Sequence, residues 1–347
     1  MGTFRLLLAL VVVVFHLDLE SSRWERFEYF TFTSILNINA TDAVNLFFFI
    51  SGFVIALTFN KNYQDSNFIY RTSYFYLNRI LRIYPLYFLA LFIGFVDSFY
   101  LNIINLPKDN PFLREDVLRN ILILFHEKGS FINPVSWTLD FELRWYFLVP
   151  LIFLIKKYWN KNKKINSYIV LIVFVYLLLE LIYLYYAKNI LLVGGFKNIF
   201  LLGEGIFYFI PGYLIFEFFN KIEIKVNNYH FLYGFFFILI ALIFPKTPIF
   251  IFFLISIYFC FTINSSNKID KIFGDLSYPV YILHMPIMLP IYLQVNKYLG
   301  VIKIEEIYIY YLVYVVTILI FFVICYFSLI FIDYPINKIR KKFKKII

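Results

Sequence analysis

Arg5 and His16 are ionisable residues within the first apolar stretch of the chain, FRLLLALVVVVFH. In a helix, eleven residues at about 100° each make three turns plus about 20°, so the two side chains share one stripe, roughly 16 Å apart. Such a helix carries a cation near one end and an imidazole, a candidate general base, near the other. A snorkelling arginine and an interfacial histidine are the alternative explanation of the same pattern.

Arg79 and Arg82 form a second pair of charges, three positions apart on one helical face of the string NRILRIYPLY. The forked guanidinium group suits phosphate, so the pair is a candidate anchor for a phosphorylated cytosolic ligand. Ordinary positive charge on the cytoplasmic side of a membrane helix is the competing explanation.

A third group, Asp140, Glu142 and Arg144, lies in NPVSWTLDFELRWYFLVP, at the start of another apolar stretch. We expect this start to lie at the membrane depth of His16, so that Glu142 can meet the imidazole. A carboxylate bonded to one ring nitrogen would orient the ring and raise its basicity. Acidic residues at a helix start are also favoured by the helix dipole, which explains Asp140 better than Glu142.

Four further residues are supporting candidates for the same site. Ser51 lies in FFFISGF, Trp137 precedes the acidic pair, and Tyr281 and His284 lie in LSYPVYILHMP. A lone histidine within a membrane is more often a structural hydrogen-bonding group than a catalyst, and this explanation of His284 stays open.

The elements that must position these groups are overwhelmingly apolar. Of the 347 residues, 62% are hydrophobic and 16% are charged, against roughly 45–50% and 25% in soluble domains. The two cysteines lie in apolar runs, where a thiol behaves as a small hydrophobe, so we expect no redox or metal site. The net charge of +10 falls in short clusters between apolar runs, which indicates membrane topology rather than nucleic-acid binding.

Stretches of about 20 apolar residues predict an all-α, polytopic membrane protein. Most of the 32 basic residues fall on one side if both termini are cytoplasmic. We expect one transmembrane domain over residues 1–347, without an appended soluble domain and with a short half-helix near residues 117–126. Ten spans are predicted, at residues 3–18, 43–60, 83–105, 141–156, 167–187, 198–219, 229–245, 248–264, 276–295 and 307–332.

Taken in order, these strings resemble acyltransferase family 3, the bacterial membrane-bound O-acyltransferases of surface polysaccharides. The resemblance covers essentially the whole chain, although the opening lacks the usual Leu-Asp-Gly-Leu-Arg-Gly lead and Asp333 replaces a frequent Glu. The matching motifs are Arg5 with His16, Phe48 to Phe53, Arg79 with Arg82, Ser136 to Glu142, Ser277 to His284, and Asp333 with Pro335.

The resemblance implies an acetyltransferase of the bacterial cytoplasmic (inner) membrane that takes acetyl-CoA from the cytosol as its donor substrate. Its acceptor would be a hydroxyl of a cell-surface or lipid-linked glycan. It implies further that Arg79 and Arg82 hold the CoA phosphates, that Arg5 lines the donor path, and that His16 is the catalytic base, with Glu142 orienting it. No permanently bound cofactor is expected.

Two other functions remain open from the sequence. A transporter of polysaccharide or lipid-linked sugar would show weak internal repeats and matching broken helices, which are not clear here. Transfer of another acyl group, such as succinyl, is not distinguished from acetyl transfer. Membrane lipids are expected partners, and the sequence fixes neither the acceptor sugar nor the oligomeric state, a homodimer included.

Overall fold

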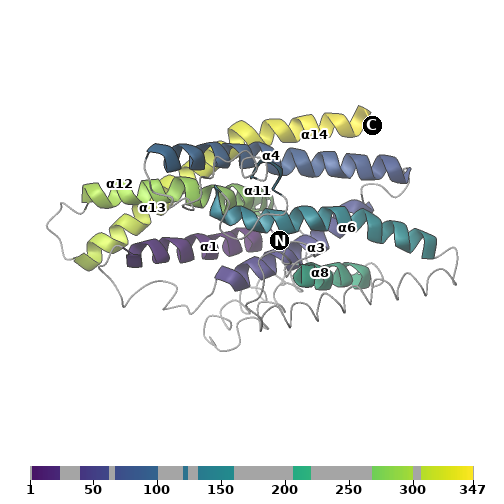
Figure 1. The fold of residues 1–347 in the computed structure, drawn as a ribbon, viewed down its shortest axis with the longest axis horizontal. Coiled ribbons are helices and arrows are strands. Elements are labelled where there is room, and N and C mark those ends of the chain that lie inside the picture. Colours follow the sequence, from purple (N-terminus) through teal and green to yellow (C-terminus); the bar gives the residue numbers. More distant parts are fainter. Residues whose placement is uncertain are drawn as a thin grey trace, which may run out of the picture.

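The computed structural model describes residues 2–23, 40–61, 67–100, 120–123, 132–159, 206–219, 268–299 and 306–346. Every regular element in these ranges is helical, and most of the helices run along the long axis of the molecule (Figure 1). The α-helices are α1 (Gly2–Arg23), α3 (Ala40–Lys61), α4 (Phe68–Tyr100), α6 (Trp137–Trp159), α8 (Ile206–Phe219), α11 (Lys268–Leu283), α12 (Leu289–Leu299), α13 (Glu306–Ser328) and α14 (Tyr334–Ile346). The short elements are the 3₁₀ turn η1 (Pro134–Ser136) and the π turns η3 (His284–Met288) and η4 (Leu329–Asp333).

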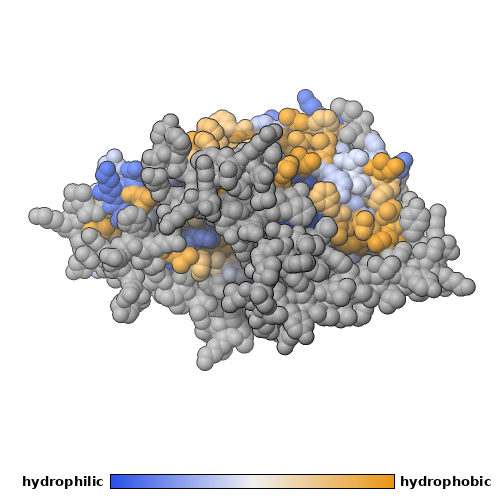
Figure 2. All heavy atoms as spheres, in the orientation of Figure 1, coloured by the Kyte–Doolittle hydropathy of each residue, from blue (hydrophilic) through white to orange (hydrophobic). Residues whose placement is uncertain are grey.

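Five of the described helical stretches are long and apolar enough to cross a membrane: Gly2–Leu19, Ala40–Asn60, Phe68–Val96, Lys268–Leu299 and Tyr311–Phe343. Large apolar side chains on α13, such as Leu319, Val323 and Phe327, are exposed. Apolar side chains also cover much of the described surface that is visible in Figure 2. Such a surface suits lipid contact rather than water, so the protein is a multi-pass membrane protein.

The described helices cover the predicted spans at 3–18, 43–60, 83–105, 141–156, 276–295 and 307–332 in whole or in large part. The spans predicted at 167–187, 229–245 and 248–264 lie outside the described residues, as do residues 198–205. Within the half-helix predicted at 117–126, residues 120–122 are helical and Ile123 has a φ of 59°.

The predicted start of the third span, at residue 83, was wrong, because α4 begins at Phe68. Arginine interrupts the apolar pattern but favours helix, so hydropathy places the boundary too late. Arg71 is also held in place: its Nε donates to the carbonyl of Phe59 at 3.0 Å, and its guanidinium lies 4.2 Å from the centre of the Phe59 ring. The last helix is likewise longer than expected, because it continues through η4 into α14.

Two close helix crossings rest on glycines. A Cβ added at Gly52 of α3 would lie 2.2 Å from the carbonyl oxygen of Phe209, and one at Gly212 of α8 would lie 2.0 Å from that of Phe49. At the second crossing, Gly2 of α1 and Gly274 of α11 leave no room for a side chain between their backbones. Small residues allow backbones to approach where lipid supplies no hydrophobic force between helices.

Helix directions follow from these crossings. Gly2 and Gly274 meet near the starts of α1 and α11, whereas His16 and His284 meet near the opposite ends, so α1 and α11 run parallel. Likewise Phe48 packs on Phe209, and Phe53 packs on Phe216. These parallel directions agree with those that the ten predicted spans give to the same four helices.

Gly52→Ala should destabilise the protein by at least the roughly 1–3 kcal/mol of an overpacked core, because the new methyl group meets fixed backbone. Thermal unfolding of the purified protein in detergent would measure the loss. Gly94→Ala is the matched control, since its Cβ would meet the Ile132 side chain at 3.3 Å, which can move, and the Ile132 carbonyl oxygen only at an ordinary contact distance of 3.4 Å. Equal melting temperatures for the two variants would contradict the role assigned to the crossing.

Candidate active site

Two histidines meet between α1 and the π turn that follows α11. Nε2 of His284 lies 3.3 Å from Nδ1 of His16, and the ring centroids are 5.0 Å apart. His284 is fully buried and His16 is partly buried. The contact joins residues 268 positions apart in the chain, so it depends on the packing of two helices rather than on local spacing.

Backbone carbonyls decide which ring nitrogens carry hydrogen in the neutral pair. Nδ1 of His16 lies 2.8 Å from the carbonyl oxygen of Val12, and Nδ1 of His284 lies 2.6 Å from that of Tyr281. A carbonyl oxygen only accepts, so both Nδ1 atoms donate and both Nε2 atoms keep a lone pair. The lone pair of His284 faces the N–H of His16. Among the described residues, Nε2 of His16 has no hydrogen-bond partner, so it is available as a base.

The π turn that begins at His284 is anchored from α6. Pro286 has no N–H, so it cannot donate to the carbonyl of Ile282 as an ordinary helical residue would. The amide of Asn133, just before η1, donates to that carbonyl at 2.8 Å instead. Tyr281 also donates through its hydroxyl to Thr138 at 3.0 Å. The start of α6 therefore lies beside the residues that hold His284.

From the sequence we expected Glu142 to contact His16, but it does not. Its carboxylate accepts a hydrogen bond from the Tyr146 hydroxyl, and the described hydrogen bonds of His16 go to Val12 and His284. The start of α6 does lie close to the histidine pair, because Thr138 contacts Tyr281. From that start, however, α6 runs in the direction opposite to α1, and four residues beyond Thr138 shift Glu142 by about 6 Å along the helix.

The other two charges of the acidic group pair with each other. Arg144 donates to the carboxylate of Asp140 one turn earlier, and both side chains are buried. A buried ion pair on a single helix explains these two residues without catalysis.

A small cavity of about 50 Å³ lies on the Arg5 side of the histidine pair, and we call it the neck. It is lined by Arg5, Val44, Phe47, Phe48, Ser51, Thr138, Leu139, Glu142, Ser277, Tyr278 and Tyr281. Four of the residues singled out in the sequence, Arg5, Ser51, Glu142 and Tyr281, are thus brought together. Trp137 does not line the neck, and it packs edge-on against the rings of Phe48 and Phe141.

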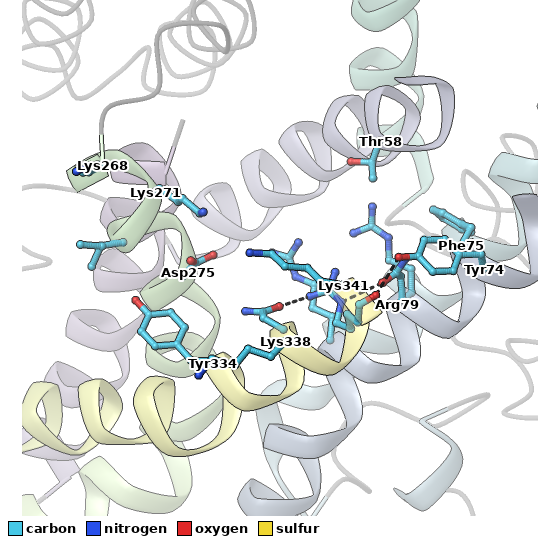
Figure 3. Close-up of a pocket in the computed structure, with 15 residues that line it drawn as sticks. Thr58, Tyr74, Phe75, Arg79, Lys268, Lys271, Asp275, Tyr334, Lys338 and Lys341 are labelled. Atoms are coloured by element: carbon cyan, nitrogen blue, oxygen red, sulfur yellow. Dashed lines mark hydrogen bonds between the residues drawn. The ribbon is translucent and has the colours of Figure 1, made fainter. Parts of the chain in front are cut away.

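A larger cavity of about 710 Å³, which we call the basic cavity, lies between α4, the start of α11, α14 and Thr58 of α3 (Figure 3). Both Arg79 and Arg82 line it. Arg79 is buried, with its guanidinium 5.2 Å from the ring centres of both Phe75 and Tyr146. Cation–π contacts on two sides hold this group in place. The other charged residues around the cavity are Lys268, Lys271, Asp275, Lys338, Arg340 and Lys341.

That five of these cations share the cavity was not predicted from the sequence. Lys268, Lys271, Lys338, Arg340 and Lys341 were interpreted only as markers of the cytoplasmic side. Their i, i+3 spacing within each helix was the one available signal, because it places Lys268 with Lys271, and Lys338 with Lys341, on one face. The convergence of these two faces beside Arg79 depends on tertiary packing, which spacing within one helix does not reveal.

Helix α11 connects the basic cavity, the neck and the histidine pair. Lys271 and Asp275 line the basic cavity, Tyr278 and Tyr281 line the neck, and His284 contacts the catalytic candidate on α1. These positions follow one another at intervals of three or four residues, about one helical turn each, so the two cavities and the histidine pair are arranged in order along the helix.

The neck and the basic cavity are also linked by their charges and by one hydrogen bond. Arg5 in the neck lies within electrostatic range of Arg79 and Arg82 as well as of Glu142. The Tyr278 hydroxyl donates at 2.8 Å to the carbonyl of Ile83, next to Arg82. The cationic end and the imidazole end of the site are therefore joined through one set of packed residues.

No group of three or more metal-ligating side chains occurs among the described residues. Comparison of the chain with curated proteins and with solved structures gave no significant match. Comparison with protein-family models matched residues 2–329 to the acyltransferase domain of acyltransferase family 3. That match spans nearly all of the chain, including both helices that carry the histidine pair. The chain belongs to acyltransferase family 3.

Proposed function

We propose that this protein is an O-acetyltransferase that moves an acetyl group from cytosolic acetyl-CoA to a hydroxyl of a cell-surface or lipid-linked glycan. One observation carries the proposal: a cavity rich in cations, a polar neck and the histidine pair follow one another along α11, and His16 of that pair has a free Nε2. A nucleotide thioester has the same order of parts, namely phosphates, a polar arm and a reacting carbonyl.

The chemistry follows from the free lone pair on His16. Nε2 takes the proton of the acceptor hydroxyl while the hydroxyl oxygen attacks the thioester carbonyl carbon. The carbon–sulfur bond then breaks, and the sulfur leaves as a thiol with the proton returned by His16. The products are an acetyl ester and free CoA. Holding the donor carbonyl and the acceptor oxygen beside one imidazole converts a bimolecular reaction into a positioned one.

The neck residues position the arm and balance the charge within the membrane. Arg5 lies in electrostatic range of Glu142, whose carboxylate is fixed by Tyr146. This arrangement gives Glu142 a role beside the donor path instead of the orientation of His16. Ser51 and Tyr281, also in the neck, offer polar groups to the amides of the donor arm.

The packing around the basic cavity supports a cytosolic donor. Thr3, at the start of α1, donates to Asp270 near the start of α11, and α14 lies across the same cavity. Both ends of the described chain thus lie near the cations, as expected if both termini face the cytoplasm of a bacterial inner membrane.

The test uses purified protein in nanodiscs with radiolabelled acetyl-CoA and a panel of candidate glycans. Free CoA should appear only when a competent acceptor is present, and the label should move to that acceptor. Passage of a lipid-linked sugar across proteoliposomes without release of CoA would instead identify a transporter. A preference for succinyl-CoA over acetyl-CoA in the same assay would correct the acyl group.

His284 orients the base in this proposal. Its Nε2 accepts from Nδ1–H of His16 and so supports the imidazolium that forms when His16 takes a proton. His284→Leu removes the acceptor at similar volume, and it should lower kcat roughly tenfold, the cost of one buried hydrogen bond. The KM for acetyl-CoA should stay within about twofold, since the phosphates lie at the far end of the site.

His284→Gln is the matched control, because a side-chain amide oxygen can accept from His16. It should restore most of the kcat that His284→Leu loses. If both variants lose stability and activity to the same extent, His284 is a packing residue only.

A further inference from the structure

The basic cavity carries more positive charge than a pyrophosphate group requires. Arg79 and Arg82 already supply two guanidinium groups near the neck. Four lysines add to them: Lys268 and Lys271 from α11, and Lys338 and Lys341 from α14, against Asp275 as the acidic group in the lining (Figure 3). An uncompensated cluster of like charges repels itself and raises the local concentration of anions.

None of these four ammonium groups has an ion pair or hydrogen bond with another described residue. Asp270, which lies between Lys268 and Lys271 in the chain, instead accepts from the backbone and the hydroxyl of Thr3, each at 2.9 Å. Ordinary topogenic lysines need no partner and point to water. These four are also exposed, but they come from two helices and line one cavity.

The wall that carries Lys338 and Lys341 is fixed rather than loosely apposed. Nε of Arg340 donates to Asn78 on α4 at 3.1 Å, and its Nη1 donates to Asn337 at 2.6 Å. The Tyr74 hydroxyl donates to the backbone carbonyl of Arg340 at 3.1 Å. Arg340 therefore attaches α14 to α4 through its Nε and its backbone carbonyl, and Lys338 and Lys341 make no such contact with a described residue.

Position along α11 separates Lys268 and Lys271 from the arginines. Arg82 is adjacent to Ile83, whose carbonyl binds Tyr278 in the neck. Lys271 and Lys268 precede Tyr278 by seven and ten residues, which places them about 10 and 15 Å farther from the neck along the helix. A donor with its arm in the neck would place its pyrophosphate at the arginines and its nucleoside end at the lysines.

We propose that Lys268, Lys271, Lys338 and Lys341 bind a phosphomonoester on the nucleoside end of the donor, so that the site selects CoA thioesters over their 3′-dephospho forms. This inference rests on the proposed function. A phosphomonoester carries about −1.5 to −2 charges near neutral pH. Compact ammonium groups suit such an anion as point charges, whereas the arginine forks suit the bridged pyrophosphate.

The experiment compares acetyl-CoA with acetyl-3′-dephospho-CoA as donors for the protein in nanodiscs. The KM of the wild-type protein for the dephospho donor should be roughly tenfold higher, as expected from the loss of one charged hydrogen-bonding interaction. The double variant Lys338→Ala/Lys341→Ala should raise the KM for acetyl-CoA about tenfold more than the KM for the dephospho donor. High salt should narrow the difference between the two donors in the wild-type protein.

Lys342→Ala is the matched control, since Lys342 lies next to Lys341 on α14, is exposed, and does not line the cavity. It should leave the ratio of the two KM values unchanged. Equal KM values for the two donors in the wild-type protein would overturn the inference while leaving acetyl transfer intact.

If neither donor supports transfer, the proposed function fails, and the lysine cluster is tested by binding alone. Adenosine 3′,5′-bisphosphate should then raise the melting temperature of the wild-type protein more than adenosine 5′-monophosphate does. The double variant should lose that difference. Equal rises in the melting temperature of the wild-type protein with the two nucleotides would show that the lysines do not bind a phosphomonoester.

Discussion

His16→Ala should lower kcat by about 10²–10⁴, the usual contribution of a positioned general base. The KM for acetyl-CoA should change little, because His16 lies roughly 16 Å along α1 from Arg5, at the far end of the site from the cations. Release of CoA from labelled acetyl-CoA, with a competent glycan and saturating donor, measures the effect. Binding of CoA to the variant shows that the donor site survives.

His16→Gln separates a base from a hydrogen-bonding group. Glutamine keeps polarity near the same place but cannot take a proton at neutral pH, so it should be nearly as inactive as alanine. A glutamine variant with more than about a tenth of wild-type activity would show that Nε2 of His16 is not the base, because such a loss is smaller than general-base catalysis usually contributes. Another group near the neck would then have to act as the base.

The parts of the fold that depend on local pattern could be predicted from the sequence. Apolar length predicted most of the described spans, and the eleven-residue spacing placed Arg5 and His16 on one face of one helix. Helix length beyond the apolar stretch was underestimated at α4 and α14. Their charged residues continue the helix, since Arg71 and Arg340 find partners on neighbouring helices. Hydropathy measures lipid contact and does not detect such partners.

The candidate site was predictable only as far as single helices define it. The contact between His16 and His284 requires two helices to cross at Gly2 and Gly274, and a proline-containing π turn to place the second imidazole. The spacing of residues within one helix does not predict where that helix crosses another. The expected contact of Glu142 with His16 was wrong for a related reason: α6 begins beside the residues that hold His284, but the Glu142 side chain lies farther along an antiparallel helix.

The two cation sets differ in what a sequence can reveal about them. The pair Arg79 and Arg82 is visible as a spacing on one helix. The lysines become part of a site only because α14 folds back along α4, through Asn78, Tyr74 and Arg340. Positive-inside charge and a phosphate site look alike in the sequence, since both place lysines at cytoplasmic helix ends. The two explanations differ in the structure, because only a phosphate site requires the lysines to line one cavity.

Arg79→Ala/Arg82→Ala should raise the KM for acetyl-CoA roughly a hundredfold or more. Each arginine lost removes charged hydrogen bonds worth about 1.5–3 kcal/mol. The kcat at saturating donor should fall only a few-fold, because neither guanidinium lines the neck or contacts the histidine pair. Steady-state kinetics at fixed, low ionic strength measures both constants, since added salt would screen the interaction.

Controls must separate loss of phosphate binding from loss of structure, because Arg79 lies between the rings of Phe75 and Tyr146. Arg82→Ala leaves that packing intact and should by itself raise KM about tenfold. Lys297→Ala removes an exposed charge on α12, outside the cavity, and should change neither the KM for acetyl-CoA nor kcat. Because the arginines are assigned to the pyrophosphate, their loss should weaken acetyl-CoA and its 3′-dephospho form equally, unlike the loss of Lys338 and Lys341. An unchanged KM in the double arginine variant would remove the phosphate anchor, and with it the direction in which the donor enters the site.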